Sequence, residues 1–209
     1  MLESTAERRP VTHLLYLHGF RSSPRSAKAQ RLAAWMAAER PDVHRWCPQL
    51  PPSPREAMAL LQAGTADWPA ERSAVVGSSL GGFYATVLAE TPARRAWRVG
   101  LVNPAVDPAR DLAAHIGEQT AWHDPAERFF FDPAFVHELR ALAPGPLSDR
   151  PRYLPIIATG DELLDWREMA ARYAGEPLLV VPGSDHALSD FDHHLPRLLR
   201  HLSLTPGSP

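Results

Sequence analysis

The sequence has one cysteine, Cys47, in 209 residues. A lone cysteine excludes an internal disulfide and a zinc site built from cysteines, and it is compatible with a reducing compartment, so we expect a cytoplasmic protein. No apolar run approaches the roughly 20 residues that a membrane-spanning helix requires. The N-terminal segment is charged and lacks the apolar core of a signal peptide, which predicts a flexible tail over residues 1–10.

The chain also lacks an excess of either charge. Lys and Arg number 22, Asp and Glu number 24, and the formal net charge is −2. This balance provides no basic stripe for nucleic acid, and the missing apolar span argues against a membrane partner. These absences favour a small-molecule substrate. No feature of the sequence specifies an oligomeric state.

Short apolar runs alternate with helical patterns along the chain, which predicts an α/β fold. The runs are continuous rather than alternating, as is typical of parallel strands with helices on both faces of the sheet. Ser23, followed by Pro24, is the expected N-cap of the first helix. The length favours one domain at 11–203 with a second tail at 204–209. The expected strands are 13–17, 43–47, 73–77, 99–102, 154–158 and 178–181.

One connection, residues 104–153, is longer than the others, and we interpret it as a short helical cap. Helical patterns occur at 107–116 and 133–142. Its aromatic residues include Trp122 and Phe130, which we predict to contact the substrate. The alternative is a pair of ordinary covering helices whose aromatic side chains only fill the core.

The run Gly77-Ser78-Ser79-Leu80-Gly81 follows an expected strand and precedes a helical pattern. A G-x-S-x-G sequence in this position is typical of a nucleophile elbow, in which a sharp turn exposes the serine. Ser79 lies between the glycines at the required spacing and Ser78 does not, so Ser79 is the candidate nucleophile.

A serine hydroxyl needs a base to remove its proton and an acid to orient that base. Asp161 and His186 each follow an expected strand, and the order Ser, Asp, His is that of the α/β-hydrolase fold. Loops that follow parallel strands meet at one edge of the sheet, so these side chains can converge. Asp165 and Glu162 remain alternatives for the acid, although Asp165 also suits the N-cap of a helix.

Acyl transfer also needs donors for the oxyanion. We predict the backbone N–H groups of Phe20, after the first strand, and Leu80, after the nucleophile. His18 ends the first strand and is interpreted as a structural residue that holds this loop. Arg21 follows this loop and could contact the substrate, but we prefer to interpret it as a solvated loop residue. Asn103 borders the site at the end of the fourth expected strand, where we interpret it as part of a backbone turn.

A cluster near the C-terminus contains Asp190, Asp192, His193 and His194. These residue types bind metals, but they lie at the start of an expected helix, where acidic side chains favour the dipole. We therefore predict no metal site.

Several runs make the chain resemble the YqiA/YcfP-like small esterases of the α/β-hydrolase superfamily. The resemblance covers residues 14–202 and implies a cofactor-free carboxylic-ester hydrolase for short acyl chains, with Ser79, Asp161 and His186 as its triad. The sequence departs from the family at 120–131 and in both tails. The matching runs are 15–20, 22–28, 48–52, 76–86, 102–106, 159–165 and 185–187.

Three alternatives stay open at this point. A thioesterase or a small-amide hydrolase would use the same groups and differ only in its contacts with the leaving group. A hydrolase fold without activity could serve as a binding module. An intact set of Ser79, Asp161 and His186 argues for the enzyme.

Overall fold

The computed structural model describes residues 10–122, 124, 126–175 and 177–205. Residues 1–9 and 206–209, which make up most of the two expected tails, lie outside the described residues. Leu204 was assigned to the second tail, but it is fully buried and its N–H donates to the Leu199 carbonyl oxygen at 2.9 Å. The packed chain therefore continues past residue 203.

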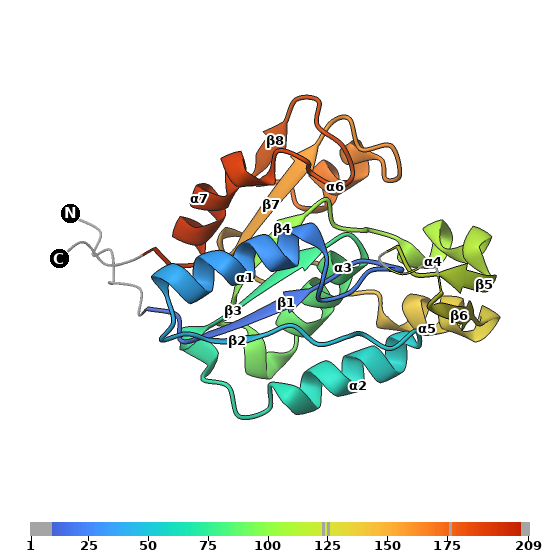
Figure 1. Ribbon diagram of the computed structural model, residues 1–209, viewed down its shortest axis with the longest axis horizontal. Helices are drawn as coiled ribbons and strands as arrows, with labels where there is room; N and C mark the ends of the chain where they lie inside the picture. The colour runs from blue at the N-terminus through green and yellow to red at the C-terminus, as the bar shows by residue number, and fades with distance from the viewer. Residues whose placement is uncertain (1–9, 123, 125, 176, 206–209) are drawn as a thin grey trace.

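A six-stranded parallel sheet forms the centre of the described chain, in the order β2-β1-β3-β4-β7-β8 (Figure 1). Each strand agrees with an expected apolar run, and every residue of β3, β4 and β7 is buried. The sheet predicted from the sequence is confirmed. The strands are β1 (His13–Leu17), β2 (His44–Trp46), β3 (Ser73–Ser78), β4 (Arg98–Val102), β7 (Tyr153–Ala158) and β8 (Leu179–Val181).

Helices cover both faces of the sheet (Figure 1). α1 (Ala27–Glu39) and α7 (Phe191–His201) pack on one face. α2 (Pro54–Gly64), α3 (Leu80–Ala89) and α5 (Pro133–Leu142) supply the apolar side chains on the other. The two-faced arrangement follows from the apolar character of the strands, because both faces of each central strand must leave water.

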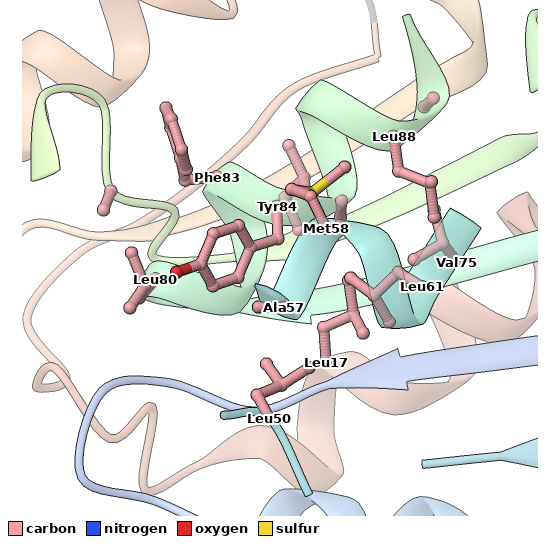
Figure 2. Packing of buried hydrophobic residues seen from close by; sticks show 14 of the residues in the cluster. Leu17, Leu50, Ala57, Met58, Leu61, Val75, Leu80, Phe83, Tyr84 and Leu88 are labelled. Carbon is pink, nitrogen blue, oxygen red and sulfur yellow. The ribbon is translucent and has the colours of Figure 1, made fainter. Parts of the chain in front are cut away.

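The core on the α2 and α3 side is shown from close by in Figure 2. Met58 and Leu61 of α2 meet Leu88 of α3 and Val75 of β3 in one cluster of buried side chains. This cluster extends to Leu80 at the first turn of α3. The turn that carries Ser79 is therefore fixed to the core immediately after the serine.

Side-chain caps determine where several helices begin. Ser53, with Pro54 at the first position, caps α2 by accepting the Glu56 N–H at 3.2 Å. Asp165 caps α6 (Trp166–Arg172) by accepting the Arg167 N–H at 2.9 Å. The role that the sequence offered for Asp165 as an N-cap is thus observed.

The start of α1 differs from the prediction. The helix begins at Ala27 with Ser26 as its N-cap, whereas Ser23 lies in the turn before it. Ser23 accepts the Arg25 N–H with its hydroxyl and the Ser26 N–H with its carbonyl. Serine and proline favour tight turns as well as helix starts, so the local pattern alone did not distinguish the two.

The segment 104–153 contains a hairpin that the sequence did not predict. α4 (Pro108–Asp111) and a 3₁₀ turn at Ala113–His115 lead into β5 (Gly117–Thr120), which pairs antiparallel with β6 (Arg128–Phe131). The expected short helical cap is therefore partly a β-hairpin. The strands are only four residues long, and consecutive aromatic residues in β6 conceal the alternation that identifies a half-buried strand. No helix in the described part of the chain is long and apolar enough to cross a membrane.

Candidate active site

The turn between β3 and α3 holds Ser79 in a strained conformation, with φ 55° and ψ −123°. Close contacts around it leave no room for side chains at the flanking glycines. A Cβ on Gly77 would lie 2.3 Å from the Gly81 carbonyl oxygen, and one on Gly81 would lie 2.1 Å from that of Leu17. The glycines of the G-x-S-x-G sequence are thus required by the approach of three backbone segments.

Hydrogen bonds to the neighbouring strand secure this turn. The Ser79 N–H donates to the Val102 carbonyl oxygen at 3.0 Å, and the Ser79 carbonyl oxygen accepts the Ala105 N–H at 3.0 Å. Val102 is the last residue of β4, and Ala105 lies in the turn that follows it. The strain at Ser79 is therefore held by the sheet, as expected for a functional turn.

Three side chains from separate loops form one hydrogen-bonded chain. Ser79 Oγ lies 3.1 Å from His186 Nε2, and His186 Nδ1 lies 2.8 Å from Asp161 Oδ2. The Asp161 side chain is 0% exposed and that of His186 is 18% exposed. With the proton on Nδ1 donated to the carboxylate, Nε2 is free to accept the proton of the serine hydroxyl. The arrangement can therefore activate Ser79 as a nucleophile.

The three acidic residues in the loop after β7 have different hydrogen-bond partners. Asp161 Oδ1 accepts the N–H groups of Leu163 and Leu164, which turns its other oxygen toward His186. Glu162 accepts the backbone N–H of His186 at 2.9 Å instead of reaching its ring. Asp165 caps α6. Among these carboxylates, Asp161 is the one that contacts the imidazole.

The loop after β1 passes directly beside the serine. A Cβ on Gly19 would lie 3.1 Å from Ser79 Cβ, so the backbone that carries the Phe20 N–H adjoins the reacting hydroxyl. The Leu80 N–H belongs to the first turn of α3, where helical N–H groups have no intrahelical acceptor. Neither N–H donates to an acceptor within the described residues. Both are available to a developing oxyanion.

His18 has the structural position expected for it. Its Nε2 accepts the Leu50 N–H at 3.2 Å, which leaves Nδ1 to donate to the Gly19 carbonyl oxygen at 3.0 Å. The side chain is 3% exposed. It connects the loop after β1 to the loop that precedes α2, and so holds the backbone next to Phe20.

A cavity of about 450 Å³ adjoins Phe20 and Leu80. Its walls are mainly apolar, and burial raises the pKa of the Tyr84 phenol far above its usual range. Polar groups come from Arg21 and a few neighbours. The lining residues are Gly19, Phe20, Arg21, Ser22, Gln49, Leu50, Pro51, Pro52, Leu60, Leu80, Tyr84, Ala121, Glu127 and Phe129.

The two predicted substrate contacts in the cap are not among these lining residues. Phe130 is 56% exposed, because it points away from the core on the outer face of β6, whereas its neighbour Phe129 lines the cavity. Trp122 is 69% exposed and stacks on Arg21, whose Cζ lies 4.0 Å from the ring centroid. Arg21 itself lines the cavity, contrary to its interpretation as a solvated loop residue.

The hairpin is attached to the loop after β1 by Arg21. Its Nε donates to the Thr120 carbonyl oxygen at 2.6 Å, and its own carbonyl oxygen accepts the Trp122 N–H at 2.8 Å. The ring of Phe20 contacts that of Phe129 edge-on, at 5.8 Å between centroids. The cap and the candidate oxyanion loop therefore form one packed wall of the cavity.

Two residues near His186 have side-chain roles that the sequence analysis did not predict. The Asn103 side chain hydrogen-bonds to backbone groups at the end of β7 and in the His186 loop. Lys28 donates its ammonium to the Ala187 carbonyl oxygen. Burial lowers the pKa of Lys28, and the nearby carboxylates of Asp185 and Asp161 act against that shift. Only the adjacency of Asn103 to a strand end could have indicated its role.

The acidic and histidine cluster near α7 is divided among other partners. Asp190 accepts the Ser184 hydroxyl at 2.5 Å and lies 2.9 Å from His194 Nε2. Asp192 pairs with Arg31 of α1 at 2.6 Å. No group of three or more metal-ligand side chains with suitable geometry occurs among the described residues.

Comparisons with solved structures give the same fold. Alpha/beta hydrolase domain-containing protein 10 from mouse superposes with a TM-score of 0.64 at 16% identity, over 91% of this chain and 90% of that one. A metagenome-derived lipolytic enzyme of the LipS and LipT pair gives 0.66 at 20% identity, over 92% and 95%. Est1E from Butyrivibrio proteoclasticus, solved with ferulic acid bound, gives 0.61 at 14% identity, over 97% and 90%.

At these identities, the superpositions show the fold alone, which is that of the α/β hydrolases. The family is established independently, by sequence. A family model described as Uncharacterised protein family (UPF0227) matches residues 13–203, from the first residue of β1 to beyond the end of α7. The chain therefore belongs to the Uncharacterised protein family (UPF0227), the YqiA/YcfP family of α/β-hydrolase-like proteins.

Proposed function

We propose that this protein is a serine hydrolase that cleaves small carboxylic esters through an acyl-enzyme. The observation that carries the proposal is the hydrogen-bonded chain from Ser79 Oγ through His186 to the buried carboxylate of Asp161. The fold is shared with a metagenome-derived lipolytic enzyme and with Est1E, which was solved with ferulic acid bound; this is consistent with the proposed chemistry but does not specify the substrate.

The reaction begins when Ser79 Oγ attacks the ester carbonyl carbon and His186 Nε2 takes the hydroxyl proton. The carbonyl π electrons move to the oxygen, and the Phe20 and Leu80 N–H groups donate to this oxyanion. Asp161 keeps the imidazole in the reactive tautomer and stabilises the imidazolium without taking its proton. The oxyanion then collapses, the bond to the alkoxide breaks, and His186 returns the proton to give the alcohol.

Deacylation repeats these steps with water as the nucleophile. His186 Nε2 takes a proton from water, the hydroxide attacks the acyl carbon, and the bond to Ser79 Oγ breaks as the proton is returned to it. A carboxylic acid is released. No cofactor takes part in either half of this scheme.

The cavity beside Phe20 and Leu80 could hold an apolar group on one side of the scissile bond. Its volume of about 450 Å³ lies within the range of small-ligand sites, which is roughly 300 to 1,000 Å³. The substrate in this proposal is therefore an ester whose acyl or alcohol part is small and apolar.

Labelling with a fluorophosphonate probe tests the proposal, because the probe reacts only with an activated serine. We expect one covalent adduct on Ser79, lost in Ser79→Ala and retained in Ser78→Ala, the matched neighbour. Absence of an adduct in the folded wild-type protein would overturn the enzyme and favour a binding module. A series of p-nitrophenyl esters from acetyl to decanoyl, with thioester and amide analogues, then determines the preferred leaving group and acyl length.

A further inference from the structure

Asn103, directly after β4, hydrogen-bonds through its side chain to the loop of His186 and to the end of β7, and it lies in the turn that contacts Ser79. It is 0% exposed and is the only asparagine in the chain. Its Nδ2 donates to the carbonyl oxygens of Asp185 and His186, each at 3.0 Å, and its Oδ1 accepts the Ala158 N–H at 2.8 Å. Two carbonyl acceptors on one side and an N–H donor on the other fix the orientation of the amide.

These partners belong to the two loops that carry the acid and the base. Ala158 is the last residue of β7, immediately before the loop that contains Asp161. The two carbonyl groups flank the Cα of His186 on its own loop. One planar amide therefore sets the distance between the backbone of the acid loop and the backbone of the base.

The backbone of the same turn contacts the nucleophile. Asn103 has φ 41°, in the left-handed region, and it precedes Pro104. A Cβ on Gly82 would lie 2.7 Å from Pro104 Cβ, and the Ala105 N–H donates to the Ser79 carbonyl oxygen. A residue before proline is normally extended, so this conformation is maintained by its surroundings.

We infer that Asn103 is a positioning residue for the hydrolytic reaction, which holds His186 in register with both Asp161 and Ser79. The inference rests on the proposed function. Its physical basis is that proton transfer depends on the 3.1 Å contact between Ser79 Oγ and His186 Nε2, and a shift of about 1 Å in such a group lowers the rate roughly 10²-fold. Substrate binding in the cavity beside Phe20 does not involve Asn103.

Two variants distinguish the contribution of the Asn103 side-chain amide from that of its backbone conformation. Asn103→Gly tolerates positive φ and removes the side chain, and Asn103→Asp keeps the acceptor for Ala158 but places a carboxylate against two carbonyl oxygens. We expect both to lower kcat for p-nitrophenyl acetate by about 10²-fold with KM unchanged. Thr65→Val is the control, since Thr65 is equally buried and hydrogen-bonded to Arg94 far from the site; it should lower stability without changing kcat.

A double-mutant cycle with His186→Ala distinguishes positioning from general support of the fold. If Asn103 acts through His186, Asn103→Gly will not reduce the residual activity of His186→Ala any further. Equal losses in both backgrounds would overturn the inference, and so would folded Asn103 variants with the wild-type kcat. A His186→Ala protein with full activity would instead refute the proposed function.

A measurement on the wild-type protein keeps the inference testable even where a variant does not fold. Because the chain has one asparagine, selective ¹⁵N-asparagine labelling gives a single pair of side-chain amide signals in NMR spectra. We expect the Asn103 amide protons to be protected from exchange with solvent. Rapid exchange in the folded protein would show that the bonds to the carbonyl oxygens of Asp185 and His186 are not held, and would overturn the inference.

Discussion

Substitution of Asp161 by Asn is the sharpest test of Asp161 as the carboxylate that orients His186. In the structure, the Leu163 and Leu164 N–H groups both donate to Asp161 Oδ1, at 2.9 and 2.8 Å. In Asp161→Asn these two donors require the amide oxygen to occupy the position of Oδ1. The amide nitrogen then faces His186 Nδ1, where the carboxylate oxygen accepted a hydrogen bond at 2.8 Å.

Two donors cannot share that contact, so His186 is expected to shift its proton to Nε2. The ring would then point a donor at Ser79 Oγ and could no longer accept the hydroxyl proton. In serine hydrolases a change of this kind costs about 10⁴-fold in kcat, or roughly 5 kcal/mol of transition-state stabilisation. The fold should persist, because both loop hydrogen bonds remain.

Asp165→Asn is the matched control, four residues along the same loop. Asn and Asp are equivalent N-caps, so this variant should retain kcat and stability. The assay is kcat for p-nitrophenyl acetate, with circular dichroism to verify folding. A loss of less than about tenfold in Asp161→Asn, or an equal loss in both variants, would refute the assignment of Asp161.

Further predictions concern the cavity, the elbow and a buried ion pair. Phe129→Ala should raise KM for longer acyl esters, whereas Phe130→Ala, on the exposed face, should leave the chain-length series unchanged. Gly81→Ala should abolish labelling by the fluorophosphonate probe, since its Cβ would lie 2.1 Å from a backbone oxygen of β1; retained labelling would refute the tight-turn argument. Burial raises the pKa of Glu90, but hydrogen bonds and Arg152 outweigh this and hold it below its usual value. The stability from this depressed pKa is complete above the ordinary glutamate pKa and is lost as the pH falls below it. Glu90→Gln should therefore lower the free energy of unfolding by about 3 kcal/mol at pH 7 in urea titrations, and by less at pH 3; an equal deficit at both pH values would contradict this.

The positions of the strands, and of the candidate catalytic residues directly after strands, were predictable because both depend on local sequence pattern. Continuous apolar runs located β3, β4 and β7, and the rule that loops after parallel strands converge brought Ser79 and His186 together. The spacing of the glycines also singled out the serine, and the structure gives the steric reason.

The remaining features depend on contacts between distant residues. Asn103 reads as a turn residue in sequence, and its role is visible only when β7 and the His186 loop lie beside it. The choice between Phe129 and Phe130 required the register of a hairpin whose strands are too short to show a period. Local composition does not encode such pairings, which are set by tertiary packing.

The strand order has a consequence for folding. Ser79 and His186 are 107 residues apart in the chain, and the strand that precedes His186 is β8, a short strand at the edge of the sheet. β8 joins the sheet through β7, and β7 pairs with β4 across the long connection at 104–153, with Val99 opposite Tyr153. Pairings between strands this far apart in the chain form slowly, because a large chain entropy is lost before they are stabilised. Reactivity of Ser79 toward a fluorophosphonate during refolding would therefore report the docking of β8 and the His186 loop, and a nascent chain would gain this reactivity only after both have been synthesised.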